Sequence, residues 1–273
     1  MAAASDSLSV SFWSLGWRSL WRDWRAGELR LLLLAVTLAV AALTAVAFFA
    51  DRLQGGLQRD ARALIGGDAV IQSDQPAPAA FVAKAAELGL QSVQTLSFPT
   101  MGRAREEEGG SARLVALKVV APGYPLRGSL RVADGPEAPD VATRDIPAPG
   151  TAWVDAALLS ALQLKIGQPL LLGDASLTLA KVIVVETDRG AGFMSFAPRV
   201  MINAADLPAS GLVQPASRVG YRLAVAGADP AVKQYVAWAE AELKKPEIRG
   251  LRLESLESGR PEMQQTLERA EKF

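Results

Sequence analysis

One uncharged stretch constrains the fold of this chain more than any other feature. Residues 31–50 read LLLLAVTLAVAALTAVAFFA, and Arg30 and Asp51 bracket them. As a helix, these twenty residues rise about 30 Å, which is the hydrocarbon thickness of a bilayer. A helix buried in a soluble core seldom stays apolar on every face over this length. The stretch therefore predicts a membrane-spanning helix, and we assign residues 29–65 to this transmembrane helix and the stalk that continues it.

A cleaved secretory signal peptide is the alternative to a permanent anchor. Ala45, Val46 and Ala47 have the small-x-small pattern of a cleavage site. However, thirty residues precede the stretch, and it is longer than the apolar core of about 7–15 residues in signal peptides. These proportions favour an uncleaved anchor.

The number of arginines on each side of the span indicates its orientation, although the two numbers differ by one. Four precede it and three follow it soon after, namely Arg18, Arg22, Arg25 and Arg30 against Arg52, Arg59 and Arg62. Cationic residues near the ends of a span are retained in the cytoplasm, whereas long domains cross the membrane largely regardless of charge. We therefore expect the N-terminus inside and the rest of the chain outside the cytoplasm.

A tryptophan-rich segment precedes the span. Trp13, Trp17, Trp21 and Trp24 are spaced four, four and three residues apart, which places their indoles on one face of a helix. Such a helix, with arginines beside the rings, is typical of the membrane interface. We expect an amphipathic interfacial helix within residues 1–28, with Gly27 permitting a bend; a soluble helix that packs its tryptophans on a protein core is the alternative.

The segment after the span keeps a helical apolar pattern over residues 51–65, and Gly66-Gly67 is expected to end it. This glycine pair is no phosphate-binding loop, because the pattern G-x-x-x-x-G-K-[ST] occurs nowhere in the chain. Any energy from a nucleotide must come from another polypeptide.

Composition excludes several chemistries. The chain has no histidine and no cysteine, which excludes histidine-based triads, zinc sites with such ligands and disulfides. Its 29 basic and 29 acidic residues argue against a nucleic-acid partner. The run Glu106–Glu108 is interpreted as a solvated hairpin tip, and Glu254 with Glu257 as an exposed polar helix face rather than the carboxylate pair of an anchored hydrolase. We therefore predict no catalytic, cofactor-binding or metal-binding residue and no enzyme.

The region beyond the stalk, residues 66–255, alternates between strand and helix patterns. Strands are expected at 68–72, 90–98, 112–121, 169–172, 177–186, 193–203, 217–226 and 248–253, and helices at 78–88, 153–164 and 229–243, the last capped by Asp229. Residues 122–150 look rich in loops because glycine and proline crowd them. The order predicts an α+β extracytoplasmic domain of two lobes, a split β-α-β lobe with an inserted β-rich lobe at about 130–212.

The last residues, 256–273, have the pattern of a second stalk helix. The pattern stops without a helix cap at Glu-Lys-Phe. We expect a fragment whose continuation would lead into a second transmembrane helix.

Four stretches of this sequence carry a resemblance to a known family. They are DRLQGGLQRDARALIGGDAVIQSD (51–74), LVALKVVAPGYPLRGSL (114–130), LKIGQPLLLGDASLTLAKVI (164–183) and FAPRVMINAADLPASGLVQPASRVGYRL (196–223). In order and spacing the chain resembles the FtsX-like permease family of ABC transporters, which includes the lipoprotein-releasing (LolC-type) and macrolide-exporting (MacB-type) permeases. It is most similar to a branch of large permeases that pair with a small ATPase and are often encoded beside a thioesterase/lysophospholipase.

This resemblance implies a location and a mode of action. It implies a permease subunit in the bacterial inner (plasma) membrane with a MacB-like periplasmic domain. A cytoplasmic ABC ATPase would move the membrane helices and, through them, the domain, a mode called mechanotransmission. Export or membrane extraction of a hydrophobic, lipid-like substrate follows as an expectation, with the lipid bilayer and a periplasmic thioesterase/lysophospholipase as further partners. The segment that contacts the ATPase in the family is absent from this sequence, so this polypeptide alone is not expected to transport. A single-pass anchored binding or scaffold module is the alternative.

Overall fold

The computed structural model describes residues 12–189, 196–214, 217–246 and 248–255. The contacts divide the chain into two compact units, Met1–Leu57 and Gln58–Phe273. The expected helix over residues 256–273 lies outside the described residues.

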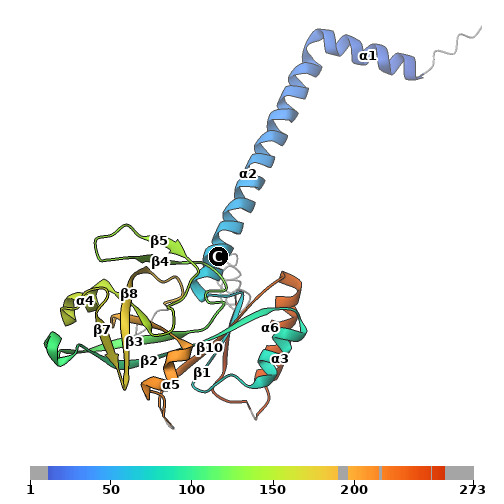
Figure 1. Ribbon diagram of the computed structural model, residues 1–273. Helices are drawn as coiled ribbons and strands as arrows, with labels where there is room; N and C mark the ends of the chain where they lie inside the picture. Colours follow the sequence, from blue (N-terminus) through green and yellow to red (C-terminus); the bar gives the residue numbers. More distant parts are fainter. Residues whose placement is uncertain (1–11, 190–195, 215–216, 247, 256–273) are drawn as a thin grey trace, which may run out of the picture. The chain divides into compact units, whose positions relative to one another are not determined.

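The first unit contains helix α1 (Phe12–Ala26) and most of helix α2 (Glu28–Ile65). Gly27 joins them with a φ of 88°, a backbone conformation that glycine adopts without steric cost, and Figure 1 shows the bend. The Leu31 amide donates to the Gly27 carbonyl oxygen at 3.1 Å, and the Arg30 guanidinium lies 5.5 Å from the centre of the Trp24 ring. The expected bend is therefore confirmed.

The indoles of α1 are exposed. Trp13, Trp17, Trp21 and Trp24 are 87%, 70%, 58% and 38% exposed, and the arginines at 18, 22 and 25 are exposed as well. The helix is confirmed, and its place at a membrane interface remains a prediction.

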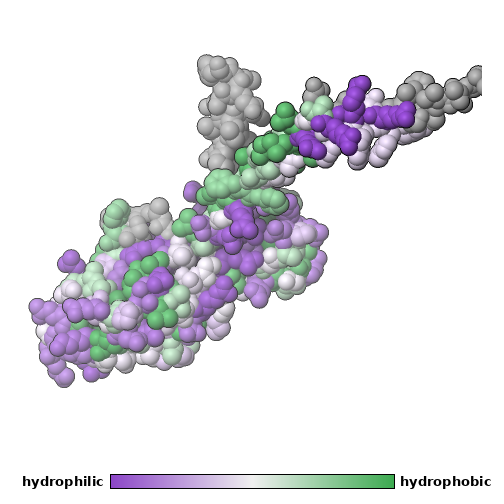
Figure 2. Space-filling view, turned by 90° about the horizontal axis from the view of Figure 1, so that it is seen from above, coloured by the Kyte–Doolittle hydropathy of each residue, from purple (hydrophilic) through white to green (hydrophobic). Residues whose placement is uncertain are grey.

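Helix α2 is one 38-residue element that Gly55 and Gly56 do not interrupt. All side chains of residues 31–50 are exposed, and α2 is long and apolar enough to cross a membrane. Figure 2 shows this hydrophobic surface in green beside the hydrophilic, purple side chains of α1. The hydroxyls of Thr37 and Thr44 donate to the carbonyl oxygens of Leu33 and Val40, each at 2.7 Å, so these polar groups are satisfied within the helix.

Eleven strands of the described residues form one sheet in the second unit, in the order β11-β1-β10-β2-β3-β9-β6-β8-β4-β5, with β7 paired to both β2 and β8. The strands are β1 (Ala69–Ser73), β2 (Gln91–Arg103), β3 (Ala112–Val120), β4 (Leu130–Ala133), β5 (Val141–Thr143), β6 (Thr151–Asp155), β7 (Pro169–Leu172), β8 (Ala175–Val185), β9 (Arg199–Asn203), β10 (Gly220–Ala226) and β11 (Arg252–Ser255). The helices and 3₁₀ turns are α3 (Ala79–Glu87), η1 (Glu106–Glu108), α4 (Ala156–Leu162), η3 (Ala204–Asp206), α5 (Leu207–Ser210) and α6 (Asp229–Leu243). The mixed α+β character is as expected.

Side chains alternate between the two faces of this sheet, as strand geometry requires. Ala69 and Ile71 of β1 pack with Phe81 of α3 and Tyr235 of α6, and Figure 1 shows these two helices side by side. Val70, between them in sequence, joins a second core on the opposite face. A third core lies between α4 and strands β3, β6 and β9.

Three local predictions are wrong. Trp153 lies in β6 rather than in a helix, because this strand is buried between β8 and β9 and so reads as a continuous apolar run; only residues 156–162 are helical. Asp229 is the first helical residue of α6 instead of its cap, and Arg62 engages its carboxylate. Glu254 lies in β11, opposite Val70, so it shares no helix face with Glu257, which lies outside the described residues.

Strand bounds also differ from expectation. The region at 122–150, expected to be rich in loops, contains β4 and β5, which pair with each other. β11 begins four residues later than the expected strand at 248, and β9 begins at Arg199 rather than 193. The hairpin of β2 and β3 is confirmed, with Glu106 and Glu107 exposed at its tip.

Candidate functional site at the base of the stalk

Residues 58–67, which include the end of α2 and belong to the second unit, contact other parts of that unit, and we call them the stalk base. The amide of Gly67 donates to the Arg62 carbonyl oxygen at 3.2 Å and closes the last turn. Gly66 has a φ of 71°, and a Cβ atom at this position would lie 2.9 Å from Oδ2 of Asp188. Only glycine combines this backbone conformation with so close an approach to a carboxylate.

Arg222 of β10 binds the last residue of helix α2. Its Nη2 donates to the carbonyl oxygen of Ile65 at 3.1 Å, and its Nη1 donates to that of Asp188 at 3.2 Å. The last carbonyl groups of a helix have no partner within it and carry partial negative charge. The guanidinium therefore satisfies the end of α2 and ties it to the segment that follows β8.

Asp68 is the second anchor of the stalk base, and its side chain is 2% exposed. Arg127 donates to both of its carboxylate oxygens, at 2.9 Å and 2.6 Å, and the Gly227 amide donates at 3.0 Å. Arg62 in the last turns of α2 lies 3.4 Å from Asp68 Oδ1 and donates to Asp229 Oδ1 at 2.9 Å. The stalk base is thus linked by ion pairs to the start of β1 and to α6.

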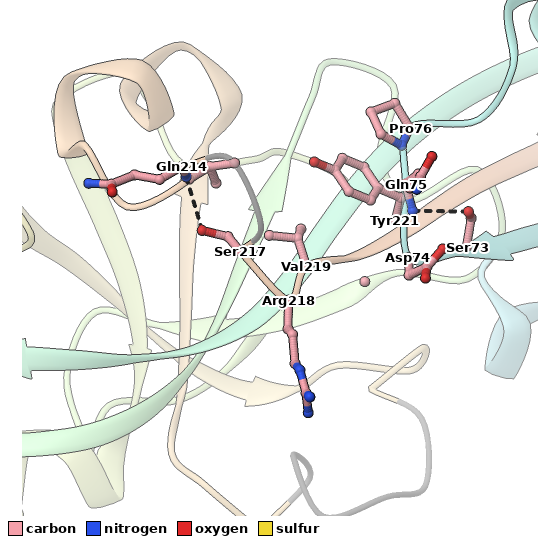
Figure 3. Close-up of a pocket in the computed structure, with 11 residues that line it drawn as sticks. Ser73, Asp74, Gln75, Pro76, Gln214, Ser217, Arg218, Val219 and Tyr221 are labelled. Atoms are coloured by element: carbon pink, nitrogen blue, oxygen red, sulfur yellow. Dashed lines mark hydrogen bonds between the residues drawn. The ribbon is translucent and has the colours of Figure 1, made fainter. Parts of the chain in front are cut away.

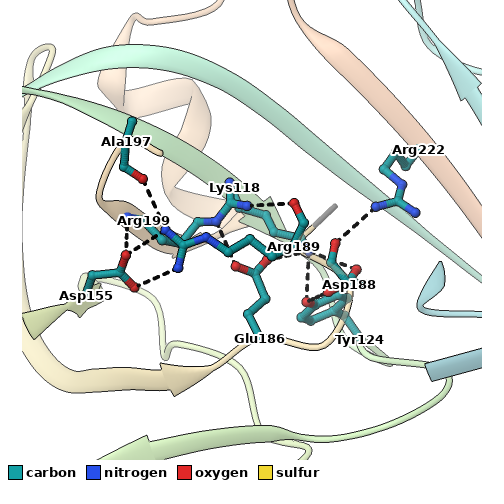
Figure 4. Close-up of polar contacts among 9 residues, drawn as sticks. All are labelled: Lys118, Tyr124, Asp155, Glu186, Asp188, Arg189, Ala197, Arg199 and Arg222. Atoms are coloured by element: carbon teal, nitrogen blue, oxygen red, sulfur yellow. Dashed lines mark hydrogen bonds and ion pairs between the residues drawn. The ribbon is translucent and has the colours of Figure 1, made fainter. Parts of the chain in front are cut away.

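Behind Gly66 lies a group of buried charges, shown in Figure 4. The ammonium group of Lys118, near the end of β3, donates to Glu186 Oε1 at 2.7 Å, Asp188 Oδ2 at 2.9 Å and the Tyr124 oxygen at 2.9 Å. Tyr124 donates to Asp188 Oδ1 at 2.5 Å, and Arg199 Nε donates to Glu186 Oε2 at 2.7 Å. We call these five residues the buried ion cluster, since all of their side chains are nearly inaccessible.

The buried ion cluster continues toward β6. The backbone amide of Arg199 donates to Asp155 Oδ2 at 2.9 Å, and Arg189 Nη2 donates to the same oxygen at 2.8 Å. Arg189 also reaches the Ala197 carbonyl oxygen at 3.1 Å. A polar chain therefore runs from the stalk base into the centre of the sheet.

The surroundings of the buried ion cluster favour the ionised carboxylate of Asp188 and the neutral phenol of Tyr124. Burial alone would raise the pKa of Asp188, but the charge of Lys118 and the hydrogen bonds from Tyr124 and Lys118 hold this pKa below its ordinary value. Burial, together with the negative charges of Asp188 and Glu186, raises the pKa of Tyr124 well above its ordinary value. At neutral pH, Asp188 is therefore ionised while Tyr124 remains a hydrogen-bond donor.

The polar groups of the buried ion cluster are engaged with one another. The three N–H donors of Lys118 are all engaged, so its ammonium group has no donor left for a further ligand. No cluster of acidic side chains suitable for a metal ion occurs among the described residues. Removing one partner of such a buried pair leaves the other charge unpaired and destabilises the fold strongly.

A cavity of about 710 Å³ lies elsewhere in this unit, between the turn after β1 and the segment before β10 (Figure 3). Its two serine hydroxyls accept hydrogen bonds from nearby backbone amides, Ser73 from Gln75 and Ser217 from Gln214, each at 3.0 Å. Asp74, Arg218 and Tyr221 are the ionisable residues among those that line the cavity. Each serine hydroxyl is thus held by a local turn, and among the described residues neither hydroxyl forms a hydrogen bond with these ionisable groups.

A mixed α+β domain that follows a long, exposed apolar helix in the chain is the class of protein that the described residues define. No family model matches the chain. The chain is, however, 33% identical over 256 residues to YbbP of Escherichia coli (strain K12), which is named an uncharacterized ABC transporter permease. The match covers 94% of this chain and 30% of YbbP, so the chain spans less than a third of its relative. The expected resemblance to a permease of this type is confirmed, and the name of a permease agrees with the expectation that the chain is no enzyme.

Among solved structures, a domain of a protein assigned as a permease from Porphyromonas gingivalis is similar, with a TM-score of 0.39 and 12% identity. The similarity covers 69% of this chain and 89% of that domain.

Sequence reasoning did not find the stalk base or the buried ion cluster. Arg222 and Ile65 are 157 residues apart, and Lys118 and Asp188 are 70 apart. The one available signal was Lys118 itself, a charge within the apolar run LVALKVV of a buried strand. A charge in such a strand needs a buried partner, although the sequence does not say which.

Proposed function

We propose that this chain is the membrane-anchored part of an ABC transporter permease subunit that passes the motion of its membrane helix to an extracytoplasmic domain. The observation that carries the proposal is the 33% identity to YbbP over 94% of the chain. The exposed, bilayer-length α2 supports it, because this helix continues without a break into the stalk base.

In this proposal the chain lies in the bacterial inner membrane with its N-terminus in the cytoplasm. The interfacial helix α1 lies on the bilayer, and residues 66–255 form the periplasmic domain. The inserted lobe at about 130–212 is supported by the chain order, since β4 to β9 and α5 all come between β3 and β10. A second stalk helix at 256–273 would lead back to the membrane.

A partner ATPase in the cytoplasm would provide the energy, because the chain has no P-loop. Its cycle would shift α2, and the domain would follow through the stalk base. We propose a hydrophobic, lipid-like substrate that is exported or extracted from the membrane, and a periplasmic thioesterase/lysophospholipase as a further partner. The resemblance to lipoprotein-releasing permeases supports this class of substrate, which partitions into the bilayer.

Co-expression of the full-length permease with the ATPase encoded beside it tests this proposal. We expect the two to purify together in detergent, and the ATPase rate to change when the permease is present. The matched control is an unrelated ABC ATPase, which should not co-purify. Failure of the neighbouring ATPase to bind, with an unchanged rate, would instead favour an anchored scaffold module.

A further inference from the structure

The last residue of α2, Ile65, accepts a hydrogen bond from a strand that lies 157 residues further along the chain. Arg222 of β10 donates one nitrogen to the Ile65 carbonyl oxygen and another to the Asp188 carbonyl oxygen, at 3.1 Å and 3.2 Å. Both acceptors belong to backbone groups, so the contact fixes main chain rather than mobile side chains. The planar guanidinium presents several donors in a fixed fork, which an ammonium group does not.

Close packing surrounds this contact on two further sides. At Gly66 an added Cβ would lie 2.9 Å from Asp188 Oδ2. At Gly128, which has a φ of 77°, it would lie 3.0 Å from the Cβ of Ala63 in α2 and 2.9 Å from Oγ1 of Thr187. Residues 187 and 188 therefore approach both the stalk base and the loop that carries Gly128. Such packing leaves little room for α2 to slide against these segments.

Asp188 connects the contact to the centre of the sheet. Its carboxylate accepts hydrogen bonds from Lys118 of β3 and from Tyr124, at 2.9 Å and 2.5 Å, while its carbonyl accepts from Arg222. A displacement of the stalk base would therefore have to move Asp188, whose carboxylate is buried and paired.

We propose that Arg222 is the positioning residue that makes the domain follow α2 when the partner ATPase moves that helix. This inference rests on the proposed function. Without the guanidinium group of Arg222, the last turn of α2 shifts relative to β10 and residue 188, and ATP hydrolysis continues without a matching movement of the domain.

The test uses the full-length permease with its ATPase in lipid nanodiscs. Residues 1–273 have no cysteine, so Glu137→Cys, at an exposed position, accepts one donor dye specifically once any cysteine in the rest of the full-length permease has been replaced by serine. Energy transfer to an acceptor dye on lipid headgroups then reports the height of the domain over the bilayer. The wild-type complex should show a change in transfer on addition of ATP.

The informative variants are Arg222→Met and Arg222→Lys, with Arg113→Met, an exposed arginine of β3, as the matched control. Arg222→Met should reduce the ATP-dependent change about threefold or more while the ATPase rate stays near that of the wild type. Arg222→Lys should give an intermediate change, and Arg113→Met the full one.

A full ATP response in Arg222→Met would overturn the inference. If Arg222→Met does not fold, Arg222→Lys decides, and a full response there would have the same consequence. Failure of the proposed function has a different signature, because then the wild-type complex itself would not assemble or would not respond to ATP.

Discussion

Replacing Lys118 with methionine removes the only ammonium group of the buried ion cluster and keeps a side chain of similar length. Glu186 and Asp188 each lose a hydrogen bond, of 2.7 Å and 2.9 Å. Breaking a buried ion pair by removing one partner costs about 3–5 kcal/mol. Glu186 keeps Arg199, and Asp188 keeps Tyr124, so we expect about 3 kcal/mol, the lower end of that range.

Thermal unfolding of the chain in detergent at pH 7, followed by near-UV circular dichroism, measures this loss. For a domain of this size, 3 kcal/mol corresponds to a fall in Tm of about 6–12 °C. Lys165→Met is the control, because Lys165 is exposed and loses the same charge; we expect it to stay within about 0.5 kcal/mol. Adding Asp188→Asn to Lys118→Met should recover part of the loss. Equal Tm values for Lys118→Met and Lys165→Met would refute the reasoning.

Three more predictions concern the same region. Asp68→Asn weakens the contacts with both Arg127 and Arg62 and should lower the free energy of unfolding by about 1.5–3 kcal/mol in urea titrations; an unchanged midpoint would contradict the role of this anchor. Gly66→Ala combines a φ of 71° with a Cβ 2.9 Å from Asp188 Oδ2, so we expect a loss of about 1–2 kcal/mol, and none if the stalk base is loose. The folded-state pKa of Asp188 is lowered, so the free energy of unfolding should fall as the pH drops below about 4. The folded-state pKa of Tyr124 is raised, so the free energy of unfolding should fall again as the pH rises above about 10. A Tyr124→Phe variant should lose less stability at alkaline pH than the wild type, and identical pH profiles of the two proteins would count against the buried ion cluster.

Local patterns in the sequence predict much of the fold. The long apolar run predicts α2, the tryptophans spaced four, four and three residues apart predict α1, and Asp229 with Pro230 marks the start of α6. These elements can be predicted from the sequence because each pattern lies within one segment. The prediction of a helix at Trp153 is wrong because a strand buried on both faces and a buried helix share the same continuous apolar run.

The stalk base could not be predicted in the same way. Its contacts join residues from α2, β10 and the segment after β8, and no local pattern records which arginine meets which carbonyl group. Lys118 indicates that a buried partner exists, but Glu186 and Asp188 become its partners only when β3 and the end of β8 come together. Such pairings depend on tertiary structure, which a single sequence does not specify by periodicity.

Labelling of intact spheroplasts with a membrane-impermeant thiol reagent tests the central claim most directly, namely that α2 anchors an outer domain in the membrane. Glu107→Cys lies at the exposed hairpin tip, and Ala3→Cys lies before the span. The account predicts a membrane-bound protein in which Glu107→Cys reacts in intact spheroplasts, whereas Ala3→Cys reacts only after the membrane is permeabilised. Reaction of Glu107→Cys only after permeabilisation, or release of the labelled protein from the membrane fraction, would contradict it.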